Sequence, residues 1–252
     1  MGRVPRGWGV LTESSEFFGE LYFETTVPFF TPERDTAEAA YLARAFAHVD
    51  VGPIVDLGCG HGRHLKRLQQ SVPEREWVGL ESDAYALERL LPGVHAVRGD
   101  VQALPFEPAS LAGAYAWYST FNSLGAVGWR GALKQVRRCL KPSGLLVFQT
   151  VNPGALAQAP KAFFSRPLPQ GGAVREHSVF DAALGVDTGR REWTNPEGQV
   201  RSASYSLWYP DLQTLKSMLA DAGFSLSFVH EGVEEVAASP YSREWIVGAN
   251  VE

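Results

Sequence analysis

The chain has 252 residues, 45% of them apolar, and a net charge of −5 at pH 7. It is long enough to bury a full hydrophobic core, and no apolar run approaches the ~20 residues of a membrane-spanning helix. Basic residues are scattered and outnumbered by acidic ones, which argues against a nucleic-acid-binding surface. Cys59 and Cys139 are too few for a disulfide framework or a Cys-x-x-Cys metal site. We expect one soluble, cytoplasmic domain over residues 1–252, without a membrane or nucleic-acid partner.

Helical and strand-like periods alternate along the first 150 residues. Thr36 or Asp35 is expected to cap the first helix, and Ser82 or Asp83 a later helix that runs through Leu91. The first helix is expected over residues 36–49, and further helices over 61–70 and 129–140. Strands are expected over 54–57, 76–81, 94–98, 111–117 and 145–149. Strands that alternate with helices pack as a parallel sheet covered on both faces.

The second half changes character. Residues 151–209 show little helical period, and Asn195-Pro196-Glu197-Gly198 forms a strong turn signal. After the turn, one side of an alternating strand carries Arg201, Ala203, Tyr205, Leu207 and Tyr209. We interpret residues 151–209 as an antiparallel β insert within the single domain. A helix then begins at Pro210-Asp211 and ends at Gly223, and residues 225–230 and 244–249 are expected to pair as an antiparallel hairpin.

Three glycines follow the first strand in the pattern Asp-x-Gly-x-Gly-x-Gly, from Asp56 to Gly62. Glycine allows a tight turn and removes the Cβ that would block a ligand, and the next helix presents unpaired N–H groups. The loop therefore indicates a ligand cradle. A nicotinamide dinucleotide is disfavoured, because its Gly-x-Gly-x-x-Gly fingerprint places the third glycine one residue later.

Polar side chains also follow the next two strands. Glu81 ends the second strand, where a carboxylate can accept hydrogen bonds from both hydroxyls of a ribose, and Asp100-Val101 follows the third. Open α/β sheets bind ligands at the carboxyl ends of their strands. Three such loops together indicate a nucleoside-containing ligand.

The chain resembles the class I S-adenosylmethionine-dependent methyltransferases from about Thr36 to Ala249. "VDLGCGHGRHL", "WVGLESD", "GDVQALPF", "LAGAYAWYSTFNSL" and "CLKPSGLLVF" resemble the five motifs of that family in order. The resemblance implies a Rossmann-like, doubly wound α/β fold with a seven-stranded sheet, mostly parallel with an antiparallel last strand. It also implies S-adenosyl-L-methionine as the cofactor and S-adenosyl-L-homocysteine as the product.

Carried over position by position, the resemblance implies a set of cofactor-binding residues. Asp56 and the glycine loop would surround the methionine part, Glu81 would bind the ribose, and Asp100 and Val101 would meet the adenine. The residues expected to bind the cofactor are Tyr22, Asp56, Gly58, Cys59, Gly60, His64, Glu81, Ser82, Asp100, Val101, Trp117, Tyr118 and Ser119.

The methyl acceptor is expected to be a small molecule. The fourth motif lacks the Asn/Asp-Pro-Pro-Tyr common among methyltransferases of nucleic-acid and protein nitrogens, although an RNA or protein methyltransferase and a non-catalytic nucleoside-binding module remain alternatives. Positioning should dominate catalysis, and no acid–base pair is evident. The candidate catalytic residues are Tyr118, Asn122, His177 and Tyr205. His61 and His64 lack a third ligand, so no metal is expected.

The N-terminal segment is rich in aromatic residues: Phe17, Phe18, Tyr22, Phe23, Phe29 and Phe30. These side chains either pack against the sheet or form a lid, placed over residues 1–35, that closes over the cofactor and excludes water. The sequence leaves the choice open. It also leaves open whether the protein is a monomer or a homodimer.

Overall fold

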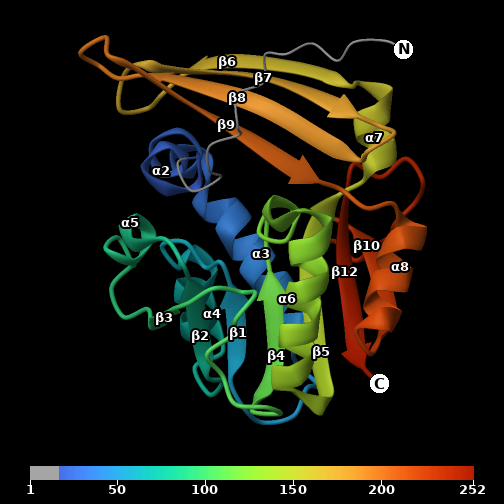
Figure 1. Ribbon diagram of the computed structural model, residues 1–252. Helices are drawn as coiled ribbons and strands as arrows, with labels where there is room; N and C mark the ends of the chain where they lie inside the picture. The colour runs from blue at the N-terminus through green and yellow to red at the C-terminus, as the bar shows by residue number, and fades with distance from the viewer. Residues whose placement is uncertain (1–16) are drawn as a thin grey trace.

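The computed structural model describes residues 17–252, which form two sheets stacked one above the other (Figure 1). A large sheet with helices on both faces forms the lower body. A four-stranded antiparallel sheet lies above the carboxyl ends of the parallel strands. Residues 1–16 of the expected lid lie outside the described part of the chain.

The large sheet has the order β11-β10-β12-β5-β4-β1-β2-β3. Neighbours from β5 to β3 are parallel, whereas β12 runs antiparallel to both β5 and β10. The doubly wound α/β fold and the antiparallel last strand are thus confirmed, and the two-residue β11 makes eight strands where seven were expected. The strands are β1 Ile54–Leu57, β2 Trp77–Glu81, β3 Ala96–Arg98, β4 Leu111–Ala116, β5 Leu140–Val151, β10 Phe224–Glu231, β11 Val236–Ala237 and β12 Glu244–Val251.

Five helices flank this sheet: α3 Pro32–Ala45, α4 Arg63–Ser71, α5 Ala84–Leu87, α6 Gly125–Cys139 and α8 Leu212–Asp221. Trp129 of α6 and Leu215 of α8 belong to one buried apolar cluster, and Leu42 of α3 and Leu65 of α4 belong to a second. Every residue of β4 is buried, as expected for a parallel strand covered on both sides. This packing holds the strand ends, and the loops that follow them, in fixed positions.

Several helix boundaries differ from the sequence-based expectation: α3 ends at Ala45 instead of residue 49, and α6 begins at Gly125 instead of Trp129. Two further differences have visible causes. α3 begins at Pro32 instead of Thr36, because Thr31 is its N-cap and its hydroxyl accepts a hydrogen bond from Arg34 N at 3.3 Å. α5 ends at Leu87 instead of Leu91. The backbone N–H of Leu91 donates to His61 O at 3.0 Å, so this stretch supports the glycine loop instead of continuing the helix.

The upper sheet, called the cap here, contains β6 Lys161–Pro167, β7 Ala173–Asp181, β8 Val186–Thr194 and β9 Val200–Trp208, and the short helix α7 Pro153–Gln158 precedes it. All neighbouring cap strands are antiparallel, which confirms the predicted insert. Tyr205 and Leu207 are buried on the inner face of β9, as the alternation predicted, whereas Arg201 at its start is exposed.

The aromatic segment at residues 17–30 lies between the cap and the lower body (Figure 1). It contains η1 Phe17–Leu21, α2 Tyr22–Thr25 and η2 Val27–Phe29. Phe17 and Leu21 join the apolar cluster of the cap, and the Arg191 guanidinium of β8 donates to the Thr25 hydroxyl at 3.0 Å. The segment therefore packs on the cap, while its Phe23 ring contacts His61 and Tyr85 of the lower body.

Candidate active site

A cavity of about 630 Å³ lies between the carboxyl ends of β1, β2 and β4 and the inner face of the cap. Ligands of open α/β sheets bind at this position. All thirteen residues expected to bind the cofactor line it, as do Tyr22, Phe17 and Phe18 of the aromatic segment. The cavity therefore has a lower wall of strand-end loops, called the cradle here, and an upper wall formed by the cap.

The glycine loop of the cradle requires glycine for two separate reasons. Gly58 and Gly62 have φ values of +74° and +80°, and a Cβ there would lie 2.8 Å from the Thr120 hydroxyl and 2.6 Å from Val94 Cγ1, respectively. Gly60 has φ +57° and nothing within 4 Å of its Cβ position. At Gly60 the missing side chain leaves open space where a ligand can approach the backbone.

Glu81 joins two strand ends. Its Oε2 accepts a hydrogen bond from Gly60 N at 2.8 Å, and its Oε1 accepts from Ser82 N and Asp83 N at 2.8 and 2.9 Å. A carboxylate has about four lone-pair sites, so the Glu81 side chain keeps capacity for a ligand hydroxyl. Asp100 lies across the cavity floor after β3, where its Oδ1 accepts from Gln102 N at 2.8 Å.

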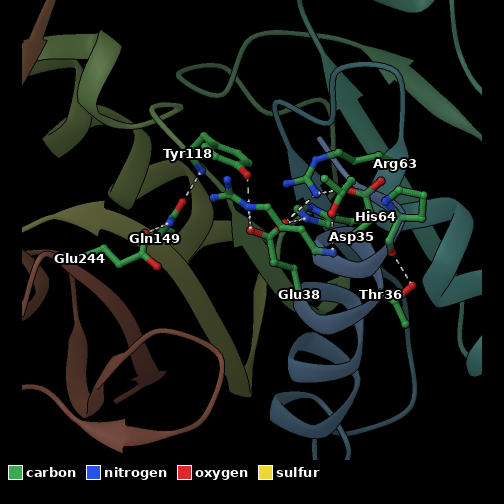
Figure 2. Close-up of polar contacts among 11 residues, drawn as sticks. Asp35, Thr36, Glu38, Arg63, His64, Tyr118, Gln149 and Glu244 are labelled. Atoms are coloured by element: carbon green, nitrogen blue, oxygen red, sulfur yellow. Dashed lines mark hydrogen bonds and ion pairs between the residues drawn. The ribbon is translucent and has the colours of Figure 1, made fainter. Parts of the chain in front are cut away.

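A buried charged network lies beside the glycine loop (Figure 2). Arg63 Nη1 contacts Asp35 Oδ1 at 2.5 Å and Glu38 Oε2 at 2.6 Å, and His64 Nε2 lies 2.9 Å from the same Glu38 oxygen. Burial opposes ionisation of Glu38, but the His64 hydrogen bond and the Arg63 charge outweigh it and hold the pKa of Glu38 well below its usual range. Burial and the Arg63 charge lower the pKa of His64 to about 4, so His64 is neutral at pH 7.

Sequence reasoning missed Arg63, which lines the cavity and is only 6% exposed. Within residues 17–252, neither Arg63 Nη2 nor Trp117 Nε1 has a hydrogen-bond partner. Buried donors are normally paired, so two orphaned donors in residues that line one cavity indicate that a ligand supplies their acceptor. No single-sequence pattern distinguishes Arg63 from an ordinary first-turn helix residue.

Asp56 and Tyr118 complete the cradle beneath the cap. Burial raises the pKa of Asp56 to about 7, although the nearby Tyr115 hydroxyl and the Arg63 charge oppose the rise. Tyr118 has a φ of +55°, and its N–H donates to Gln149 Oε1 at 3.0 Å. Gln149 Nε2 in turn donates to Glu244 Oε2 at 2.6 Å, as Figure 2 shows. This chain of hydrogen bonds stabilises the uncommon backbone of Tyr118.

The cap contributes polar side chains from its inner face. Arg191 Nε lies 2.5 Å from Glu176 Oε2, and the Tyr205 hydroxyl donates to Glu176 Oε1 at 2.9 Å. Asp187, the second residue of β8, also lines the cavity and is 8% exposed. Sequence analysis singled out only Tyr205 from this group.

The four candidate catalytic residues have different positions. Tyr118 and Tyr205 line the cavity. Asn122 is buried, and its Nδ2 donates to Thr150 Oγ1 at 3.0 Å and to Trp208 O at 2.9 Å, so it ties the large sheet to the cap. His177 is exposed on the outer face of β7, where its ring lies 4.6 Å from that of Phe163. Only the two tyrosines are brought to the site.

Two further features concern metal and membrane binding. Residues 17–252 contain no cluster of three or more His, Cys, Asp or Glu side chains placed to hold a metal ion. The same part of the chain contains no helix that is both long and apolar enough to span a membrane.

Comparison with known proteins identifies the cradle. Residues 54–144, from β1 to the turn within β5, match the family model described as a methyltransferase domain. Among curated proteins, the chain is 30% identical over 125 residues to a trans-aconitate 2-methyltransferase of Acidovorax ebreus, a match that covers 48% of this chain and 46% of that one. It is 27% identical over 182 residues to a malonyl-[acyl-carrier protein] O-methyltransferase of Dechloromonas aromatica, covering 66% and 61%. The chain thus spans about half to three fifths of these relatives.

Solved structures agree over nearly the whole length. The CcbJ methyltransferase from Streptomyces caelestis superposes with a TM-score of 0.79 at 23% identity, covering 93% of this chain and 96% of that one. The sugar N-methyltransferase KedS8 from Streptoalloteichus superposes with a TM-score of 0.68 at 16% identity, covering 98% and 97%. At these identities the likeness concerns the fold. The residues that match the methyltransferase domain model carry the glycine loop, Glu81 and Asp100.

Proposed function

We propose that the protein transfers the methyl group of S-adenosyl-L-methionine to a small-molecule acceptor. The observation that carries this proposal is the cavity of about 630 Å³ with its two walls. Its volume lies within the range of small-molecule sites, about 300–1,000 Å³. The cradle has the strand-end chemistry of a nucleoside site, and the cap covers the space where an acceptor would lie beside it.

The cradle is proposed to bind the cofactor in three parts. Glu81 accepts a ribose hydroxyl, and Asp100 and the Val101 backbone bind the adenine. The glycine loop and Asp56 surround the methionine part, whose carboxylate is bound by the unpaired donors of Arg63 and Trp117. Tyr118 and Ser119 separate the methionine part from the acceptor, and Tyr22 covers it from above.

The main contribution of the protein to the reaction is to position the acceptor nucleophile relative to the sulfonium methyl. A sulfonium methyl is already activated, so the nucleophile needs an in-line approach at ~3–3.5 Å in a cavity without competing water. The aromatic segment supports this role, because Phe17, Phe18 and Tyr22 line the cavity and the Phe17 ring lies 4.8 Å from that of Tyr205. We propose that residues 17–35 act as part of the lid and residues 151–209 as the acceptor cap, within one domain.

A small acceptor is favoured over RNA by the charges of the cavity. Six carboxylate side chains line it against two arginines, and Arg63 and Arg191 are both paired with carboxylates. An acidic surface repels a phosphate backbone. A cytoplasmic location and a monomeric or homodimeric state are part of the proposal; the free cysteines Cys59 and Cys139 fit a reducing compartment.

The test separates cofactor binding from methyl transfer. Calorimetry should show S-adenosylhomocysteine binding with micromolar-range affinity, with no competition from NAD. Radiolabelled S-adenosylmethionine should then label a fraction of a metabolite pool but neither RNA nor protein. Tight NAD binding without binding of the sulfonium cofactor would overturn the family function. Label in RNA or protein would overturn the acceptor class, and binding without any transfer would identify a non-catalytic module.

A further inference from the structure

Asp187 is a buried carboxylate that has no cation beside it. It lies on the inner face of β8, opposite Phe180 of β7 and Leu207 of β9, and it is 8% exposed. None of the ion pairs within residues 17–252 includes Asp187. A buried charge is normally paired or hydrogen-bonded, because its desolvation is costly. Asp187 lines the cavity, so a ligand is well placed to supply the missing partner.

The neighbouring carboxylate, Glu176, shows the contrast. Arg191 Nε lies 2.5 Å from one of its oxygens, and the Tyr205 hydroxyl donates to the other at 2.9 Å. Gly189, between Asp187 and Arg191 on the inner face, makes this arrangement possible, because a Cβ there would lie 2.1 Å from Tyr205 Cζ. The tyrosine ring therefore crosses β8 over Gly189 and reaches Glu176. Arg191 pairs with Glu176, so it does not neutralise Asp187.

Aromatic side chains line the same cavity as the Asp187 carboxylate. Tyr205 and Tyr209 of the cap line the cavity with Asp187, and Phe17, Phe18 and Tyr22 do so from the aromatic segment. An unpaired carboxylate among aromatic faces is the environment that binds an organic cation, since ring faces also attract positive charge. A carboxylate or phosphate acceptor would meet repulsion from Asp187 and find Arg191 already paired.

We propose that the methyl acceptor is an amine, and that Asp187 binds its ammonium group and takes its proton. This inference rests on the proposed methyltransferase function and names the acceptor class for it. The malonyl-[acyl-carrier protein] relative is named an O-methyltransferase and the KedS8 structure an N-methyltransferase, so the acceptor atom is inferred from Asp187 and not from the comparisons.

The step balances with the groups present. The Asp187 carboxylate accepts one proton from the ammonium nitrogen, which frees the nitrogen lone pair. That lone pair forms the new N–C bond to the sulfonium methyl, and the C–S bond breaks with its electron pair going to sulfur. The products are a methylated ammonium, the neutral thioether of S-adenosylhomocysteine and a protonated Asp187, which returns its proton to water.

The groups that face Asp187 support a proton-accepting role. Burial raises the pKa of Asp187, the Glu176 charge adds to the rise, and the Ser178 hydroxyl on β7 opposes it. Tyr205 and Tyr209 have raised pKa values, through burial first and carboxylate charges second, so both are neutral donors at pH 7. Tyr22 across the cavity is likewise neutral, with a pKa raised to about 12 by burial. A carboxyl with a raised pKa is the better general base near neutral pH.

The test uses two sets of probes that share one body and differ in charge. Tyramine, 4-(2-hydroxyethyl)phenol and 4-hydroxyphenylacetate form one set; glucosamine, glucose and glucuronate form the other. Calorimetry on the protein loaded with S-adenosylhomocysteine should show the ammonium member of at least one set binding more tightly than its hydroxyl and carboxylate counterparts. Asp187→Asn should reduce that preference by about 10- to 100-fold, because one charge-assisted hydrogen bond is lost.

Glu192→Gln is the matched control. Glu192 is on β8 but faces away from the cavity, and its change to an amide should leave the preference intact. Affinity for S-adenosylhomocysteine and the melting temperature without ligand should be unchanged in Asp187→Asn, which excludes a structural cause. For the preferred amine, the acid limb of the kcat/KM profile should move to higher pH in Asp187→Asn, because the free amine must then form in solution.

The outcomes separate this inference from the proposed function. Absence of any preference for the ammonium members, or its survival in Asp187→Asn, would overturn the amine inference. Methyl transfer to a hydroxyl or carboxylate member with none to its amine would do the same while confirming the methyltransferase. Failure to bind S-adenosylhomocysteine would instead overturn the function on which the inference rests.

Discussion

The cradle and the cap form opposite walls of one cavity, and they are built by different means. In the cradle, backbone groups and strand-end carboxylates face the cavity, held by the glycine loop and by Glu81. In the cap, the inner face of an antiparallel sheet presents side chains such as Asp187 and Tyr205. The family model matches residues 54–144 and stops before the cap. This contrast supports the proposal that the cradle binds the cofactor and the cap binds the acceptor.

The largest expected effect tests whether the cradle depends on its buried charges. Arg63→Ala should destabilise the protein by about 3–5 kcal/mol, because it leaves Glu38 and Asp35 buried without their main cation. Urea denaturation measures this change. Arg34→Ala is the control, since Arg34 contacts the same Glu38 at 3.0 Å with a side chain that is 46% exposed, and it should cost about 0–1 kcal/mol. Equal losses for the two variants would contradict the buried-network account.

Much of the cradle could be predicted from the sequence because its signals are local. The spacing of the glycines, the apolar pattern of the strands and the turn-forming residues predict β1 at its observed bounds. They also predict that Glu81 and Asp100 lie at the ends of strands. Arg63 could not be predicted in the same way. Its burial arises from Glu38, 25 residues earlier, and no periodicity links the two helices before they pack.

In the cap, fewer of the site residues could be predicted from the sequence. Alternation in β9 predicts that Tyr205 and Leu207 share one side of the strand, and residues 195–198 carry a turn signal that the structure confirms. The roles of Glu176, Asp187 and Arg191 depend on register between neighbouring strands, which alternation alone does not fix. The short α5 has a similar cause, because the Leu91 N–H bonds to His61 O in a tertiary contact.

The second effect concerns affinity in the cradle alone. Glu81→Ala should weaken S-adenosylhomocysteine binding by about 2–4 kcal/mol, or ~30- to 1,000-fold, through the lost ribose contact and a loosened Gly60. Glu81→Gln should cost less, since one amide oxygen still accepts. Calorimetry gives the affinities, and Glu88→Ala, an exposed carboxylate after α5, serves as the control. If Glu81→Ala binds normally and melts normally, the ribose assignment is wrong.

The third effect is the pH dependence of S-adenosylhomocysteine affinity. It should arise from the cradle and should not depend on the cap. Because burial raises the pKa of Asp56 to about 7, binding the α-ammonium group of the methionine part beside Asp56 below that pH requires release of a proton. Affinity for S-adenosylhomocysteine should therefore rise with pH up to about 7 and level off above it, with a slope of up to about 1.4 kcal/mol per pH unit. The pKa of His64 is lowered to about 4, so His64 stays neutral over this range, and burial also lowers the pKa of His61.

Calorimetry from pH 6 to 7.5 measures this slope in three proteins. Asp56→Asn should abolish it, and Asp187→Asn should retain it, since Asp187 belongs to the acceptor wall. A slope that persists in Asp56→Asn would show that another group titrates on cofactor binding. A slope that disappears in Asp187→Asn would show that the two walls are not separate.

The smallest effect compares one tyrosine from each wall. The Tyr205 hydroxyl donates to Glu176 at 2.9 Å, whereas the Tyr118 hydroxyl lies 3.4 Å from Glu38 Oε1, near the limit of a hydrogen bond. Tyr205→Phe should lower the free energy of unfolding by about 1 kcal/mol, because water in the cavity can replace part of the lost bond, and Tyr118→Phe by less. Affinity for S-adenosylhomocysteine should be unchanged in Tyr205→Phe, while transfer to the acceptor slows because the aromatic ring at this position loses its bond to Glu176 and lines the acceptor wall less rigidly. A loss of cofactor affinity in Tyr205→Phe greater than that in Tyr118→Phe would place Tyr205 in the cofactor wall and remove the distinction between cradle and cap.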